Sequence, residues 1–128
     1  METMDQKICL DSDIIIDFLN RKEETYEKIK SYDAHFVTTS VNVFEVWIGR
    51  KENEIVKEFF DTVDILPFDS NASILAADIM RELKRTGKIL DFRDIFIAAI
   101  CINNRLSLLT NNKSDFSRLT KFGLLVLE

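Results

Sequence analysis

Short, mostly apolar runs alternate along the chain with longer segments in which apolar residues recur every three or four positions. The short runs predict β-strands, and they are Lys7 to Leu10, His35 to Thr38, Asp64 to Phe68, Leu106 to Leu109 and Leu124 to Leu127. The third run contains the only proline, which favours an edge position because proline cannot donate a hydrogen bond to a neighbouring strand. We therefore expect a sheet of about five short strands.

The longer segments have the periodicity of helices that pack against a sheet. They are Asp13 to Leu19, Thr25 to Ser31, Val41 to Ile48, Asn53 to Asp61, Ala72 to Leu83 and Ile95 to Ile102, with a short helical turn near Ser114. Gly87 is expected to stop the fifth of these helices. Strands that alternate with helices predict right-handed crossovers and an α/β fold, here a three-layer α/β/α sandwich around a central parallel sheet.

Length and composition indicate an ordinary globular chain. Its 128 residues, 46% of them hydrophobic, are enough to bury a core, so we expect a single domain over residues 1–128. No apolar run approaches the roughly 20 residues of a membrane helix, and Met1 to Leu10 does not resemble a secretory signal. Cys9 and Cys101 lie in apolar segments without metal or redox spacing. These features predict a cytoplasmic protein with two buried thiols.

The net charge of −5 argues against a protein that simply coats nucleic acid, because such binding depends on neutralising phosphates. It does not exclude a nuclease. Carboxylates gathered to hold cations would themselves make the balance negative.

Four acidic residues occupy places that a doubly wound sheet would bring together. Asp11 directly follows the first strand, and Asp115 follows the strand that ends at Leu109. Asp94 opens a buried helix, and Glu45 lies in a largely apolar helix. In open parallel sheets, ligands bind beyond the carboxyl ends of the strands, near the point where the strand order reverses.

Each of these acids also has a purely structural interpretation. Asp11, Asp94 and Asp115 suit helix starts, where carboxylates cap the backbone and complement the helix dipole, and Glu45 suits the rim of a core face. Asp91 is expected to be an N-cap. If the four acids lie together, however, their carboxylates repel one another. Two carboxylates about 6 Å apart repel by about 3 kcal/mol at an effective dielectric constant of about 20. A cluster of four therefore needs bound protons or cations.

The nature of the cation follows from the other side chains. His35 is the only histidine, so neither a zinc site nor metal-free cleavage by paired histidines is expected. Hard divalent ions with oxygen ligands, Mg²⁺ or Mn²⁺, suit the acids better. Such ions activate water for hydrolysis.

Four segments, in order, resemble the PIN-domain family and, within it, the VapC-like toxins. They are Leu10-Asp11-Ser12-Asp13, Thr39-Ser40 followed by Glu45, the segment Asp94-Ile95-Phe96-Ile97-Ala98-Ala99, and Leu109-Thr110-Asn111-Asn112-Lys113-Ser114-Asp115-Phe116. The resemblance covers essentially the whole chain, and the four segments have the family's spacing.

The resemblance implies an acidic pocket whose catalytic, metal-binding members are Asp11, Glu45, Asp94 and Asp115. Asn112 is an alternative to Asp115 as the fourth ligand. Further residues are expected to assist or to orient the carboxylates, namely Ser12, Asp13, Ser40 and Thr110. The cation would be Mg²⁺ or Mn²⁺.

The resemblance also implies an endoribonuclease, the toxin of a VapBC-type toxin–antitoxin system. Its partners would be an RNA substrate, an antitoxin whose tail occupies the active-site groove, and a second copy of the chain in a homodimer. Some of the ten phenylalanines are expected to line such surfaces. Candidate phosphate contacts are Arg50, Lys51, Arg93 and Lys113.

Three other functions fit parts of the pattern. The nearest is a PIN-domain nuclease that processes RNA or cleaves DNA. A receiver-like signalling domain would use Asp69, after the third strand, as a phosphoacceptor. The third is an interaction module without catalysis, in which all the acids are helix caps.

Overall fold

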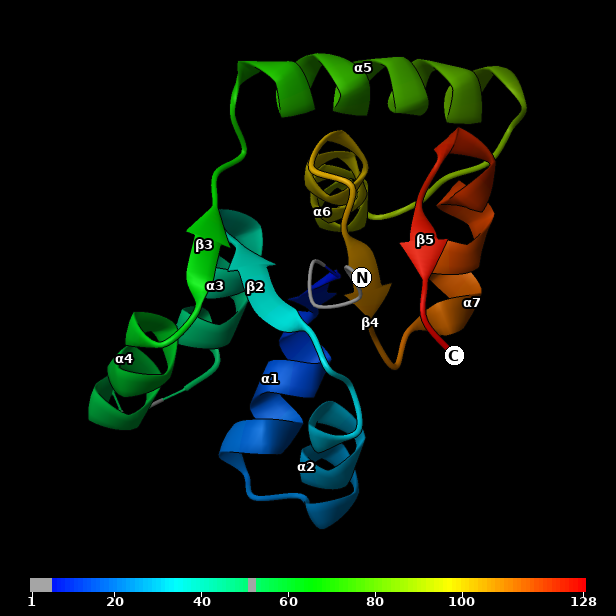
Figure 1. The fold of residues 1–128 in the computed structure, drawn as a ribbon. Coiled ribbons are helices and arrows are strands. Elements are labelled where there is room, and N and C mark those ends of the chain that lie inside the picture. The colour runs from blue at the N-terminus through cyan, green and yellow to red at the C-terminus, as the bar shows by residue number, and fades with distance from the viewer. Residues whose placement is uncertain (1–5, 51–52) are drawn as a thin grey trace.

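The computed structural model describes residues 6–50 and 53–128, and within them five parallel strands form one sheet in the order β3-β2-β1-β4-β5 (Figure 1). The strands are β1 (Lys7–Leu10), β2 (His35–Thr39), β3 (Asp64–Leu66), β4 (Ser107–Leu109) and β5 (Leu125–Val126). The expected run from Asp64 to Phe68 is too long, because β3 ends at the residue before Pro67. Its edge position is confirmed.

The helices follow the predicted pattern with small shifts at their ends. They are α1 (Ser12–Leu19), α2 (Glu23–Lys30), α3 (Ser40–Ile48), α4 (Asn53–Asp61), α5 (Ser70–Arg85), α6 (Phe92–Asn103) and α7 (Lys113–Phe116), followed by the 3₁₀ helix η2 (Ser117–Phe122). Helix α5 begins before the predicted start at Ala72, because Asp69 caps it, and it ends shortly before Gly87. Gly87 has a φ of 76°, a left-handed conformation that glycine adopts more easily than other residues.

Alternating residues of the central strands point to the two faces of the sheet. Ile8 and Leu10 of β1 pack with buried residues of α1, α3 and α4, such as Val46. Cys9, between them, packs with the buried faces of α5 and α6, such as Ile97. In Figure 1, α5 and α6 lie above the sheet and α1 and α2 below it. The sheet is covered on both faces, which confirms the expected α/β/α architecture.

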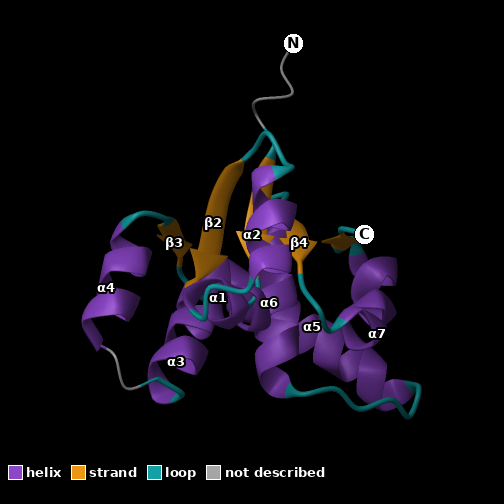
Figure 2. Ribbon diagram, turned by 90° about the horizontal axis from the view of Figure 1, so that it is seen from below, coloured by secondary structure: helices purple, strands orange, loops and turns teal. Residues whose placement is uncertain are grey.

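The strand order reverses between β1 and β4. The chain moves outward from β1 through β2 to β3, then returns to place β4 and β5 on the other side of β1. Figure 2 shows α4 beside β3 at one edge and α7 near the carboxyl end of the chain at the other. Asp11 and Thr110 directly follow β1 and β4, and the Asp11 amide donates to Leu109 O at 3.0 Å. Residues at this switch point are placed where α/β proteins bind ligands.

Two expectations about the rest of the chain can be compared with the structure. Cys9 and Cys101 are both buried and free, as predicted. Within the described residues, no helix has the length and apolar character required to cross a membrane.

Candidate metal-binding active site

Asp11 is the most firmly held of the predicted site residues. Its side chain is buried, and Oδ1 accepts hydrogen bonds from the Ser12 amide at 2.8 Å and from Asn42 Nδ2 at 3.0 Å. Its Oδ2 accepts from Thr110 Oγ1 at 2.6 Å. Burial raises the pKa of this carboxyl, and the three hydrogen bonds oppose that effect by favouring the charged form. The starts of α1 and α3 and the residue after β4 therefore hold this carboxylate in a fixed orientation.

Glu45 reaches the same region from α3. Its Oε1 accepts from Ser12 Oγ at 2.5 Å, and Oε2 lies 3.5 Å from Arg93 Nε. Burial raises its pKa most, and the charge of Asp11 raises it further, whereas the Ser12 hydrogen bond and the Arg93 cation lower it. Ser12 thus links the start of α1 to α3, and Arg93 provides a partial counter-charge.

Asp94 lies in the first turn of α6 and carries the strongest sign of a crowded acidic site. The pKa of its carboxyl is raised to about 7, first by burial and then by the negative charges of Asp11, Asp91, Glu45 and Asp115. These residues come from four separate parts of the chain. A carboxyl in this setting holds a proton near neutral pH unless a cation offsets its neighbours.

Asp13 is a further acid at the edge of this group. Its Oδ2 accepts from the Asn111 amide at 3.1 Å, while Oδ1 is buried with no hydrogen-bond partner among the described residues. Burial, with the charge of Asp11, raises its pKa to about 6. A buried oxygen without a donor is open to an added proton, water or cation.

Two residues of this site have a role that the sequence reasoning did not assign. Asn42 had no assigned role within the helix predicted from Val41 to Ile48, yet it is fully buried and bonds Asp11 and Ser12. Its position three residues before Glu45, on the same helix face, was the available signal. Asp91 is the expected N-cap of α6, and its side chain also pairs with Arg93 at 3.3 Å, which holds that cation beside Glu45.

The residues expected to assist the carboxylates separate into two groups. The hydroxyls of Ser12 and Thr110 bond to site carboxylates. The backbone amide of Asn112 donates to Thr110 Oγ1 at 2.9 Å, so Asn112 adjoins the site through its backbone. Ser40 was predicted to orient a carboxylate, but its hydroxyl accepts from the Phe68 amide at 3.2 Å instead. This bond ties α3 to the segment after β3.

The predicted phosphate contacts also differ in their surroundings. Arg93 is half-exposed beside the acids. Arg50 donates to Asn20 Oδ1 at 2.7 Å, and Lys113 donates to the main-chain oxygen of Glu128. Lys51 lies outside the described residues. Arg93 is therefore the cation best placed to meet a substrate near the carboxylates.

A divalent cation fits the chemistry of these donors. They are carboxylate oxygens, which Mg²⁺ and Mn²⁺ prefer. Across residues 6–50 and 53–128, no three Asp, Glu, His or Cys side chains are grouped so that they could hold a metal ion as they stand. Mg²⁺ commonly binds through one or two carboxylates and retains several waters. The site therefore suits a partly hydrated ion or side chains that close around it.

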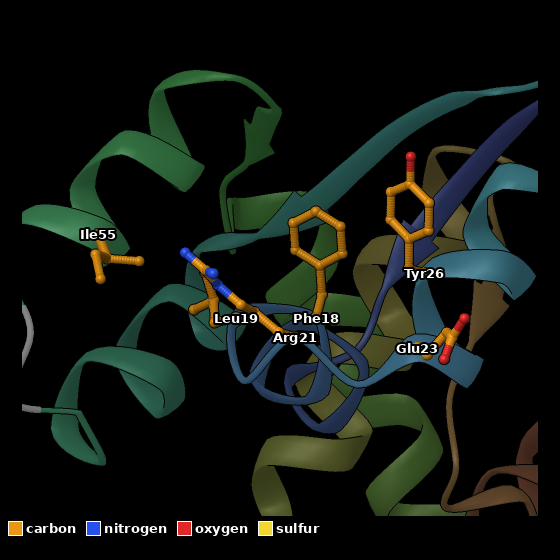
Figure 3. Close-up of a pocket in the computed structure, with 6 residues that line it drawn as sticks. All are labelled: Phe18, Leu19, Arg21, Glu23, Tyr26 and Ile55. Atoms are coloured by element: carbon orange, nitrogen blue, oxygen red, sulfur yellow. The ribbon is translucent and has the colours of Figure 1, made fainter.

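A partly apolar hollow of the surface lies away from these acids. It has a volume of about 560 Å³ and lies between the end of α1, the start of α2 and α4. Its lining consists of Phe18, Leu19, Arg21, Glu23, Tyr26 and Ile55 (Figure 3). None of the predicted catalytic residues lines it, so this hollow is a surface distinct from the acidic site.

The sequence model of the PIN domain matches residues 8–121. This match includes β2, β3 and β4, all but the first residue of β1, and all four predicted acids. The chain therefore belongs to the PIN domain family, as its four motifs indicated. That membership speaks against a receiver-like domain, and Asp69 is an exposed N-cap of α5 rather than part of the acidic site.

The chain also resembles individual proteins over most of its length. The chain is 35% identical over 92 residues to ribonuclease VapC3 of Methanocaldococcus jannaschii, a match that covers 71% of this chain and 94% of the relative. Ribonuclease VapC1 of that organism is 28% identical over 128 residues, covering 100% and 92% of the two chains. A crystal structure of VapBC2 from Rickettsia felis, bound to a DNA fragment from its promoter, has a TM-score of 0.84 at 20% identity and covers 95% and 98% of the two chains. This last likeness concerns the fold.

Proposed function

We propose that this protein is a divalent-metal-dependent endoribonuclease and the toxin of a VapBC-type toxin–antitoxin pair. One observation carries the proposal: acids from separate parts of the chain, Asp11, Glu45 and Asp94, gather near the switch point of the sheet, where burial and the charges of the other acids raise the pKa of Asp94. The names of the relatives, ribonucleases of the VapC group, support the choice of RNA as substrate.

Asp11, Glu45 and Asp94 would hold one Mg²⁺ or Mn²⁺, with Asp115 or Asn112 shaping this site or a second one. When bound, such an ion lowers the pKa of a coordinated water and offsets negative charge on the scissile phosphate. Asp13, with its unpartnered buried oxygen, would orient a water or hold a proton nearby.

The chain's own residues bind and orient the substrate phosphate. Arg93 projects half-exposed beside Glu45, where its guanidinium can donate to phosphate oxygens. Ser12 and Thr110 keep the two carboxylates beside it in fixed orientations. In-line attack by water leaves a 5′-phosphate and a 3′-hydroxyl, so the ribose 2′-hydroxyl is not the nucleophile.

The experiment that tests this function measures cleavage of end-labelled structured RNA by purified protein. Cleavage should require added Mn²⁺ or Mg²⁺, should stop with excess EDTA, and should leave 5′-phosphate ends. Arg93→Ala should raise KM for RNA. Cleavage that survives EDTA, or products with 2′,3′-cyclic phosphate ends, would contradict the proposal.

The antitoxin partner would use the hollow of Figure 3 in addition to the acidic site. The rings of Phe18 and Tyr26 point the same way, and Ile55 lies on α4 across the hollow (Figure 3). Tyr26 and Ile55 are about half-exposed, so apolar side chains of a partner would bury area that water now covers. Co-purification with the protein encoded by the neighbouring gene tests this. Ile55→Glu should weaken the complex at least about tenfold, whereas Ile74→Glu, a change at a more exposed residue on α5, should not.

A homodimer would use a second apolar surface, between α5 and α6. Met80 and Phe92 line two adjoining hollows there, and Ile89 and Phe92 are among the most exposed large apolar side chains. We expect light scattering to give twice the mass of one chain, and Ile89→Glu to halve it. A monomeric parent protein would contradict this part of the proposal.

RNA processing or DNA cleavage remains the nearest alternative within the family. The same assay with single-stranded and duplex DNA of matching sequence separates DNA cleavage from the proposed activity. A neighbouring reading frame for a short antitoxin separates a toxin from a processing enzyme.

A further inference from the structure

A chain of hydrogen bonds connects four side chains around Asn42, all of them buried or partly buried. Thr39 Oγ1 donates to Asn42 Oδ1 at 2.7 Å, and Asn42 Nδ2 donates to Asp11 Oδ1 at 3.0 Å and to Ser12 Oγ at 2.9 Å. Ser12 Oγ then donates to Glu45 Oε1 at 2.5 Å. Because Asn42 and Thr39 are fully buried, water does not compete for these bonds.

The direction of each bond follows from the donors available. The backbone amide of Asn42 donates to Thr39 Oγ1 at 3.1 Å, so the hydroxyl of Thr39 uses its own hydrogen for the side-chain oxygen of Asn42. That fixes the amide with its NH₂ group toward the acids, because the flipped amide would place an oxygen against the Asp11 carboxylate. Ser12 accepts from this NH₂ group, and its single hydrogen points to Glu45.

This arrangement also leaves the two oxygens of Asp11 unequal. Oδ1 accepts two hydrogen bonds, one from the Ser12 amide and one from Asn42, which uses both of its lone pairs. Among the described residues, Oδ2 accepts only from Thr110. Oδ2 is therefore the Asp11 oxygen that keeps a lone pair for an incoming ligand.

We infer that Asn42 is a positioning residue that orients Asp11 and Glu45 for the cation through this oriented chain of hydrogen bonds. The inference rests on the proposed function. An asparagine suits the role because it supplies two donors without adding charge to a site already crowded with carboxylates. Aspartate at the same position would remove both donors and add another negative charge.

Titration of the purified, metal-free protein with Mn²⁺, followed by the electron paramagnetic resonance signal of the free ion, tests the inference. Asn42→Leu, of similar volume, should weaken Mn²⁺ binding by about 10- to 100-fold, the usual cost of losing a residue that orients ligands. Thr39→Val should weaken it by about 3- to 10-fold, although Thr39 bonds neither carboxylate. Thr39→Ser, which keeps the hydroxyl, should stay within about twofold of the parent.

Loss of the α3 cap is a separate consequence of Thr39→Val, so a matched control is needed. Asp69 caps α5 by accepting from the Ala72 amide at 2.9 Å, away from the acids. Asp69→Ala should lower the melting temperature without changing Mn²⁺ affinity. If Asn42→Leu does not fold, the Thr39 pair decides the question alone.

The possible results test the role of Asn42 and the proposed function separately. A parent protein that binds Mn²⁺, with Asn42→Leu and Thr39→Val binding equally well, overturns the role of Asn42 and leaves the proposed function standing. A parent that binds no Mn²⁺ overturns both. Weakened binding in Thr39→Val, restored in Thr39→Ser, supports the inference.

Discussion

The starts of α1 and α5 have the same pattern of residue types and different chemistry. Each is an apolar residue, an aspartate and a serine, and each aspartate is the N-cap of its helix. Asp69 is exposed and caps α5 through the Ala72 amide. Asp11 is buried, and its carboxylate turns to Asn42 and Thr110.

The position of the preceding strand explains this difference. β3 is an edge strand, so few groups surround the residue that follows it. β1 is the central strand, with β2 and β4 on either side, so the ends of three strands and the start of α3 converge on Asp11. An aspartate that looks like a cap in the sequence becomes a candidate ligand when its strand is central.

The largest effect should be the contrast in catalysis between these two caps. Asp11→Asn removes a ligand from a site that depends on several, so cleavage of RNA should fall by at least about a thousandfold, equal to about 4 kcal/mol. Asp69→Asn should stay within about twofold, because its carboxylate bonds the Ala72 amide at the start of its own helix. Initial rates at saturating Mn²⁺, with circular dichroism as the folding control, measure both. Equal losses of cleavage rate in the two variants would contradict the difference in function between Asp11 and Asp69.

An intermediate effect concerns the stability of the metal-free protein. The pKa of Asp94 rises from 3.8 to about 7 on folding, so the folded state binds more protons between these pH values. This contribution is fully present below about pH 4 and is lost as the pH rises through 7. Because the carboxyl is about half-buried, we expect about 1–2 kcal/mol of the free energy of unfolding to be lost by pH 7.5.

Asp94→Asn isolates that contribution from the other carboxyls. The variant should be more stable than the parent at pH 7.5 and no more stable at pH 4, as measured by urea unfolding in EDTA. Adding Mn²⁺ should stabilise the parent and not the variant. A parent and variant with parallel pH profiles would show that Asp94 does not lie in a crowded acidic site.

The smallest effect should be the loss of a cap alone. Asp69→Ala is expected to lower the free energy of unfolding by about 1 kcal/mol. Urea unfolding at one pH is sufficient to measure it. A change in RNA cleavage beyond what partial unfolding explains would place Asp69 in the functional site after all.

Most of the fold could be predicted from the sequence because local signals agree with the global arrangement. The apolar run of β1 and the helical periodicity of α5 are strong over their whole lengths. The end of β3 was misjudged because Phe68 continues the apolar pattern beyond Pro67, where strand pairing has already stopped. Such boundaries depend on pairing between strands, which the pattern alone does not specify.

The candidate site was less completely predicted, for a physical reason. Asp11, Asp94 and Asp115 could be proposed as ligands because their positions at strand ends and helix starts are visible in the sequence. Asn42 and Ser40 were not assigned correctly, because both are polar residues in the same helix and only the packing decides which one faces the carboxylates. Ser40 faces the segment after β3, and Asn42 faces Asp11.

The central claim is that acids distant in the sequence share one divalent cation. Crystals soaked in Mn²⁺ test it most directly, through the anomalous scattering of the metal. The account predicts one strong peak beyond the carboxyl end of β1, coordinated directly or through water by Asp11, Glu45 and Asp94. A peak at another place, or crystals that bind no Mn²⁺ while the acids keep their positions, would contradict it.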